Sequence, residues 1–354
     1  MGTYSDTTLL LMLAGVKIVI VLLILLTAVA YLSWLERKVV AHIQSRWGPY
    51  RVGPHGLLQP LADGLKFITK EEILPLEADR IAYWLAPFLG FVLAFISIAV
   101  IPFGGSYTIR GIPIQFQISD INVGLLFIFA VTSLGVYSIA LAGWSSNSKY
   151  PLFGALRSSA QMISYELALG LAVVGVIMLS GTLSLRGIVN AQSGFWHLAG
   201  VNTRLPHWNV FVQPVAFFVY FTAAVAETNR VPFDLPEGET ELVAGFHTEY
   251  SSMKFAMFFM SEYANMVTVS CLATLLFFGG WHGPVFGPWV LRMLLPVFWF
   301  CLKVFCFLFF YIWMRGTLPR FRYDQLMSFG WKFLLPLGLL NVLVTSLVVA
   351  WHAS

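Results

Sequence analysis

The sequence predicts an all-α, polytopic membrane protein with about eight transmembrane helices and one amphipathic interfacial helix. Of the 354 residues, 58% are hydrophobic and only 11% are charged, whereas a soluble domain has about 45–50% apolar and about 25% charged residues. The apolar residues gather in runs that approach or exceed the roughly 20 residues needed to cross a bilayer core. These runs lack the alternation of membrane-barrel strands, so each is predicted to be a helix.

The predicted spans form a single membrane domain, residues 1–354. The first run is too long for the apolar region of a signal peptide and has no basic segment before it, so it is expected to remain as a spanning helix. The eight spans are expected at about residues 8–34, 81–101, 121–142, 158–180, 210–226, 254–278, 289–313 and 331–351.

The positive charges predict the orientation of these helices. Most of the 21 Lys and Arg residues lie in the loops that follow the first, third, fifth and seventh spans. Cytoplasmic loops carry such an excess of Lys and Arg, so both termini are expected on the periplasmic side. The predicted cytoplasmic loops cover about residues 36–80, 143–157, 227–253 and 314–330.

The first cytoplasmic loop contains the expected amphipathic helix, at about residues 56–70. Gly-Pro pairs at 48–49 and 53–54 interrupt the chain before it. One side carries Leu57, Leu61, Leu65 and Ile68, and the other carries Gln59, Asp63, Lys66 and Lys70. Such a helix lies in the membrane interface. It serves either as a surface anchor or as the wall of a cavity in which Asp63 and Lys66 face a polar head group.

The loop after the fifth span is unusually acidic. Residues 226–250 hold six of the 17 acidic residues of the chain and one cation, Arg230. This concentration favours a proton or ion pathway, or a docking surface, at the membrane boundary. The six carboxylates are Glu227, Asp234, Glu237, Glu239, Glu241 and Glu249.

Four charged residues lie inside predicted spans and away from the span ends: Lys17, Glu166, Glu262 and Lys303. A charge at the bilayer centre costs about 2.5–3.5 kcal/mol on insertion scales, so such residues often mark functional sites. Glu166 and Glu262 are candidate members of a proton path, or structural carboxylates that pair with an arginine such as Arg157. Lys17 either extends toward the interface or pairs with a carboxylate, and the sequence assigns no role to Lys303.

The three cysteines, Cys271, Cys301 and Cys306, lie in apolar helical runs without metal-ligand spacing. They are expected to be small buried side chains. No metal or iron–sulfur site is predicted on this chain.

Four long segments carry a family resemblance. They are LERKVVAHIQSRWGPYRVGPHGLLQPLADGLKFITKEEILP, GWSSNSKYPLFGALRSSAQMISYE, AETNRVPFDLPEGETELVAGFHTEYSSMKFAMFFMSEYANM and RGTLPRFRYDQLM. Over about residues 8–350 the chain resembles the H-type, quinone-chamber membrane subunits of proton-pumping NADH:quinone oxidoreductase, respiratory complex I, in their bacterial form. Gly238 replaces an alanine that is usual in that family, which changes no charge.

The resemblance implies two groups of site residues. The residues that it places in the quinone chamber or its mouth are Glu36, Arg37, Arg46, Asp63, Lys66, Phe67, Arg230 and Phe233. Those that it places in a carboxylate path for proton coupling are Glu166, Glu227, Glu237, Glu239, Glu241 and Glu262. Asp234 and Glu249 either join this path or hold the acidic loop in shape.

The resemblance also implies cofactors, partners and location. Quinone is the expected substrate, and the iron–sulfur clusters, FMN and NADH are expected on partner subunits. The expected partners are peripheral-arm subunits beside the chamber, small membrane subunits, antiporter-like subunits and lipid, with no nucleic acid. The expected location is the bacterial inner membrane.

Three other functions compete with this interpretation. A homologous membrane subunit of an energy-converting hydrogenase or ferredoxin-linked complex shares the carboxylates but need not reduce quinone. A stand-alone proton-coupled transporter would have its substrate site near the midplane, whereas the polar groups here gather at the cytoplasmic end. A purely structural anchor would have no need of Glu166 or Glu262.

Overall fold

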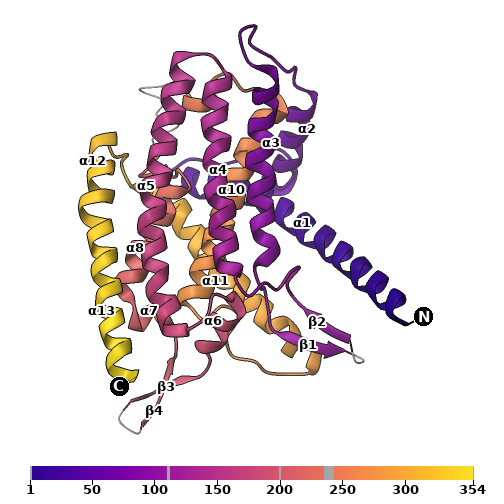
Figure 1. The fold of residues 1–354 in the computed structure, drawn as a ribbon. Coiled ribbons are helices and arrows are strands. Elements are labelled where there is room, and N and C mark those ends of the chain that lie inside the picture. The colour runs from indigo at the N-terminus through magenta and orange to yellow at the C-terminus, as the bar shows by residue number, and fades with distance from the viewer. Residues whose placement is uncertain (1, 110–111, 199–200, 235–242, 354) are drawn as a thin grey trace.

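The structure, a computed structural model, describes residues 2–109, 112–198, 201–234 and 243–353. It is a bundle of long helices, so the predicted all-α membrane fold is confirmed (Figure 1). Within these residues, seven helical stretches are long and apolar enough to cross a membrane. Two short antiparallel hairpins, which the sequence analysis did not predict, lie in the connections.

The bounds of the elements are as follows. The long helices are α1 (Gly2–Ile43), α3 (Arg80–Ile96) with the 3-10 turn η2 (Ser97–Val100), α4 (Gly124–Ser145), α5 (Lys149–Ser180), α10 (Ser252–Phe277), α11 (Trp289–Thr317), and the continuous run of α12 (Tyr323–Phe329), the π-helical turn η4 (Gly330–Leu334) and α13 (Leu335–Ala353). The shorter elements are η1 (Pro54–Gly56), α2 (Gln59–Thr69), β1 (Ser106–Ile109), β2 (Ile112–Gln115), α6 (Leu185–Ala191), β3 (Phe195–Leu198), β4 (Val201–Pro206), α7 (Asn209–Val212), α8 (Pro214–Glu227) and η3 (Gly245–His247).

The span predicted at 210–226 is interrupted. It consists of α7 and α8, and α8 has only 14 residues. Pro214 causes the break, because proline disfavours helical backbone in the residue before it and lacks an N–H group. Gln213 accordingly leaves the helical conformation, with φ −126° and ψ 56°. Its side chain donates to Thr345 Oγ1 at 2.8 Å and accepts from Asn341 at 2.9 Å, so α13 satisfies this buried amide.

Several helices extend beyond the predicted spans. α1 continues to Ile43, so Glu36 and Arg37 lie on a helix. The loop predicted at 143–157 is reduced to Ser146–Ser148, because α5 already begins at Lys149. Helices end at a proline, a glycine or a cap, and charged side chains at the membrane boundary do not end them. Apolar length therefore predicted the spans better than their ends.

The connections alternate between the two ends of the bundle. Both termini and both hairpins lie at one end, and α2 and the first residues of α3, α5 and α12 lie at the other (Figure 1). At the second end, the Asp79 carboxylate caps α3 by accepting from the backbone N–H groups of Ile81 and Ala82. This arrangement collects the predicted Arg-rich loops and the start of the acidic segment at one membrane boundary.

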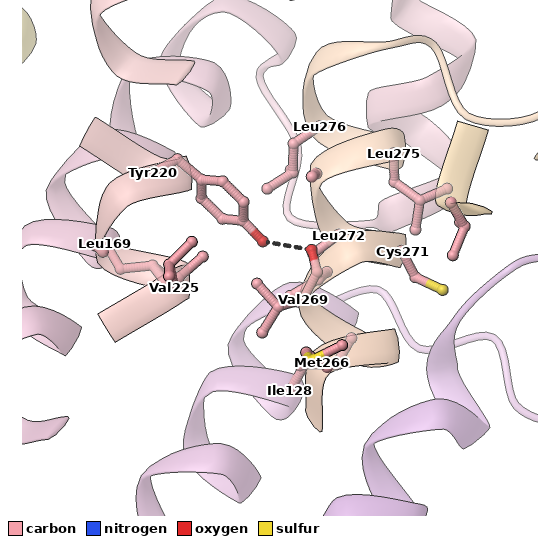
Figure 2. Close-up of a cluster of buried hydrophobic side chains, with 14 of the residues drawn as sticks. Ile128, Leu169, Tyr220, Val225, Met266, Val269, Cys271, Leu272, Leu275 and Leu276 are labelled. Carbon is pink, nitrogen blue, oxygen red and sulfur yellow. Dashed lines mark hydrogen bonds between the residues drawn. The ribbon is translucent and has the colours of Figure 1, made fainter. Parts of the chain in front are cut away.

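One face of α8 is buried against the neighbouring helices. Ala216, Ala223 and Ala224 are buried on α8, and small residues let membrane helices approach closely. Figure 2 shows Tyr220 of α8 pointing at α10, where its hydroxyl donates to the carbonyl of Val269 at 3.0 Å. This contact satisfies a buried polar group and fixes the depth of α8 relative to α10.

Lys303 of α11 stabilises the far end of α10. Its Nζ donates to the carbonyls of Phe278, Gly280 and His282 at 2.7–2.9 Å. It also lies over the ring of Trp208 at 4.8 Å. The carbonyl groups that follow a helix lack intrahelical donors, and a cation stabilises that end. The hydrogen-bond partners of Lys303 are thus backbone carbonyls.

We expect Lys303→Met to destabilise the protein by about 1–3 kcal/mol, because buried carbonyls would lose their donors. The measurement is the thermal unfolding midpoint of the chain within its detergent-solubilised assembly. Lys17→Met is the matched control, since within the described residues Lys17 makes one hydrogen bond, of 3.4 Å, with the carbonyl of Gln117. Equal midpoints for the two variants would contradict this role.

Candidate functional site

An ion network joins α1, α10, α11 and the loop after α8. Glu36 on α1 is buried and pairs with Arg230 Nη1 at 3.2 Å and with Arg315 of α11. Tyr263 of α10 donates its hydroxyl to Glu36 Oε2 at 2.8 Å. One carboxylate thus holds together side chains from three separate parts of the chain.

Arg230 occupies the centre of this network. Its Nε lies 2.5 Å from Glu262 Oε1, and its guanidinium lies over the Tyr263 ring at 4.4 Å. Burial by itself lowers the pKa of Arg230, but Glu262, Tyr263 and Glu36 raise it, and the net pKa is above the ordinary value. The guanidinium therefore stays charged and is shared by the buried Glu36 and the partly buried Glu262. Leaving either carboxylate without a cation would be costly.

A second cluster lies where α1 meets α2. Arg37 Nη1 lies 2.7 Å from Asp63 Oδ2, and Gln59 donates to Asp63 Oδ1 at 3.1 Å. Lys66 Nζ lies 3.8 Å from Asp63 and 4.8 Å from the centre of the Phe67 ring. Because Arg37 follows Glu36 directly, this cluster adjoins the ion network.

The predicted amphipathic helix is confirmed as α2. Leu61 and Leu65 are 64% and 65% exposed, so the apolar stripe faces outward. Ser252 at the start of α10 donates to the carbonyls of Phe67 and Lys70, at 2.9 and 3.0 Å. The last turn of α2 is thereby tied to the helix that carries Glu262.

The predicted coupling carboxylates Glu166 and Glu227 lie apart from the α1–α2 cluster, on α5 and at the end of α8. Glu227 ends α8, beside Thr132 of α4 and within electrostatic range of Glu166 of α5. Ser133 of α4 donates its hydroxyl to Glu166 Oε1. Three helices therefore bring two carboxylates together.

A cavity of about 60 Å³ connects Glu227 with Glu262. Helices α3, α4, α5 and α10 surround it, together with the segment from Thr228 to His247 as far as the structure describes it. Its polar lining residues are Thr132, Ser138, Glu227, Thr228, Asn229, Asp234, His247, Ser261, Glu262 and Asn265. A cavity needs roughly 10–15 Å³ to hold one water molecule, so this cavity has room for a few.

The start of the acidic loop is held firmly against the bundle. Gln161 of α5 donates to the carbonyls of Ala226 and Phe233 at 2.8 and 2.7 Å. Phe233 stacks on Phe321 with 5.5 Å between ring centres, and Asp234 pairs with Arg320 at 3.1 Å. Asp234 thus helps to hold the loop in shape, which is one of the two roles considered for it above.

The remaining predicted residues differ in their placement. Arg46 lies on the exposed segment after α1, where its Nε donates to Gln44 at 2.8 Å, and the structure does not join it to the Arg37–Asp63 pair. The Glu249 carbonyl accepts from the Tyr83 hydroxyl at 2.6 Å, which anchors the end of the acidic loop. Glu237, Glu239 and Glu241 lie outside the described residues.

The structure places three further residues at the site. Arg315 and Tyr263 contact Glu36, and His247 lines the cavity. Arg315 opens the RGTLPRFRYDQLM segment, and its position at the same membrane boundary as Glu36 could have suggested it as a partner. No periodic pattern pointed to Tyr263 or His247.

Comparison with known proteins gives consistent matches over nearly the whole chain. Residues 16–346 match the family profile described as NADH dehydrogenase. Three relatives are named as H-type subunits of NADH-quinone oxidoreductase. The one from Koribacter versatilis is 62% identical, with 98% of this chain and 99% of that protein covered. The one from Solibacter usitatus is 51% identical, with coverages of 95% and 96%. The one from Geobacter metallireducens is 54% identical, and 94% of each chain is covered.

We expect Arg230→Met to destabilise the chain by about 3–5 kcal/mol, because Glu36 and Glu262 would lose the buried cation that they share. The double variant Arg230→Met/Glu262→Met should recover part of this loss, since apolar side chains can replace a buried ion pair. The measurement is the thermal midpoint of the assembled protein in detergent.

Arg322→Met is the control for this experiment. Arg322 and Asp324 pair at 3.3 Å with side chains that are 77% and 68% exposed, and exposed pairs contribute little. If Arg230→Met were no more destabilising than Arg322→Met, Arg230 would not have the central role described above.

Proposed function

Because the chain belongs to the NADH dehydrogenase family and aligns along its length with H-type subunits, we propose that it is the membrane subunit of an NADH-quinone oxidoreductase that forms much of the quinone chamber. It also provides a carboxylate path that couples quinone reduction to proton translocation. One observation carries the proposal: ionisable groups follow one another from the α1–α2 cluster, through the ion network, to Glu227 and Glu166.

The α1–α2 cluster forms the mouth of the chamber. Asp63, Arg37 and Lys66 supply donors and acceptors for a polar head group, and Phe67 supplies an apolar surface beside them. The exposed leucines of α2 lie where a lipid-soluble substrate enters from the membrane. Glu36, Arg230 and Phe233 lie farther in, and Arg46 lies at the outer rim.

Coupling follows from the shared charge of Arg230. Reduction of quinone to quinol takes two electrons, supplied by a partner subunit, and two protons. Any change of charge at the chamber alters the balance with which Glu36 and Glu262 share Arg230. Groups that interact this closely titrate as a coupled set. Glu262 then passes the change to Glu227 and Glu166, and Glu237, Glu239 and Glu241 extend the path.

The other components lie on partner subunits. This chain supplies no complete redox site, and the iron–sulfur clusters, FMN and NADH belong to the peripheral arm. That arm docks beside the chamber, and small membrane subunits and antiporter-like subunits continue the path in the membrane. The chain spans the bacterial inner membrane, with both termini on the periplasmic side and the Arg-rich loops in the cytoplasm.

The relatives favour this function over that of a hydrogenase component, because those compared above are named as subunits of NADH-quinone oxidoreductase. The test is purification of a tagged chain in mild detergent. We expect iron–sulfur and antiporter-like subunits to co-purify with inhibitor-sensitive NADH:quinone reductase activity. Co-purification with hydrogenase subunits instead, or recovery of a functional chain alone, would overturn the proposal.

We expect Glu227→Gln to lower coupled turnover at least about tenfold, which corresponds to about 1.4 kcal/mol in activation free energy. The amide keeps the shape of the side chain but cannot take up or release a proton. The measurement is NADH oxidation together with proton uptake in inverted membrane vesicles. Asp324→Asn, at an exposed carboxylate, is the matched control and should behave as wild type. Wild-type turnover and pumping in Glu227→Gln would rule out Glu227 as a coupling group.

A further inference from the structure

His247 faces the cavity that connects Glu227 with Glu262, and none of the roles described above uses it. It ends η3, the short turn that follows the acidic segment. Its ring lies among three aromatic side chains, with centre distances of 3.7 Å to Phe246, 5.7 Å to Phe255 and 5.6 Å to Phe258. The imidazole is thus held between an apolar wall and a cavity with acidic residues.

The backbone holds His247 rigidly. Its N–H donates to the Ala244 carbonyl at 3.2 Å, and its carbonyl accepts from the Tyr250 N–H at 2.9 Å. Gly245 has a φ of +57°, and a Cβ placed on Gly154 of α5 would lie 2.8 Å from the Gly245 Cα. Such close contact between α5 and η3 requires glycine at both positions. These contacts fix the backbone of His247, and the three aromatic rings around the imidazole restrict its orientation.

The ring is neutral at physiological pH. Burial lowers the pKa of His247 to about 4, although a hydrogen bond from one ring nitrogen to the Ala244 backbone opposes this shift. A neutral imidazole that donates from one nitrogen has an acceptor at the other. Packing among phenylalanines does not require this acceptor, and burying it without a partner would cost free energy.

Three acidic side chains line the same cavity as His247. Glu227 faces it from α8, Glu262 from α10 and Asp234 from the loop. Arg230 pairs with Glu262, and Arg320 pairs with Asp234. A water molecule in this space can donate to the imidazole and still reach a carboxylate, because water bridges polar groups that are too far apart for direct contact.

We propose that His247 is a positioning residue for proton coupling: its imidazole accepts a hydrogen bond from cavity water and so orients the water between Glu227 and Glu262. This inference rests on the proposed function, because it assumes that protons move along these carboxylates. It adds a neutral residue from η3 to a path otherwise made of acids.

Two substitutions separate this role from simple packing. His247→Gln keeps a hydrogen-bond acceptor at a similar reach, whereas His247→Phe fills the aromatic pocket and removes the acceptor. In inverted membrane vesicles with the complete complex, we expect His247→Phe to lower the number of protons translocated per NADH oxidised at least twofold. His247→Gln should restore most of that ratio, and the quinone KM should be unchanged in both variants.

The outcomes are distinct. A wild-type proton ratio in His247→Phe would overturn the inference. An equal loss in both variants would also overturn it, because the histidine would then serve packing or another purpose that glutamine cannot replace. If the wild-type chain fails to assemble with quinone reductase activity, the proposed function itself fails. If the wild type assembles and pumps while His247→Phe pumps normally, only the role of His247 is rejected.

Discussion

The arrangement at this membrane boundary depends on one buried guanidinium group shared by two carboxylates, of which Glu36 is buried and Glu262 is partly buried. Arg230 comes from a loop, whereas Glu36 and Glu262 come from helices that are far apart in the sequence. None of the three can be buried cheaply alone, because an unpaired charge in an apolar surrounding costs several kcal/mol. The network therefore forces α1, α10 and the loop after α8 to meet at one point. Arg315 adds α11 to the same junction.

α10 connects this junction to the rest of the molecule. Its first residue, Ser252, binds the end of α2, its middle carries Glu262 and Tyr263, and the carbonyls beyond its last turn are bound by Lys303. A helix fixed at both ends moves as a unit. A shift of α2 would accordingly be felt at Glu262, so α10 joins the α1–α2 cluster, which we propose as the chamber mouth, to Glu262.

The sequence predicted the helical class, the positions of the spans and the amphipathic helix, because these follow from local apolar length and periodicity. It did not predict the pairing of Glu36 with Arg230, whose positions are 194 residues apart, since no local pattern encodes such a contact. Lys303 shows the same limit: its charge within a span was evident, but its carbonyl partners depend on how α10 ends. Proline chemistry predicts the break before Pro214, but the apolar composition of residues 210–226 favoured one uninterrupted helix.

The short α8 also affects the surrounding lipid. A helix of 14 residues rises only about 21 Å, whereas the hydrocarbon core is about 30 Å thick. Phe218 and Val215 on α8 are 49% and 38% exposed, so this shortened helix presents apolar surface outward. Because the four residues of α7 complete this span only after the break at Gln213, lipid in contact with α8 would meet a helix shorter than the hydrocarbon core, which favours local thinning of the bilayer. The local bilayer thickness, and hence the chain length of the lipids, would then influence the position of α8, the helix that ends at Glu227.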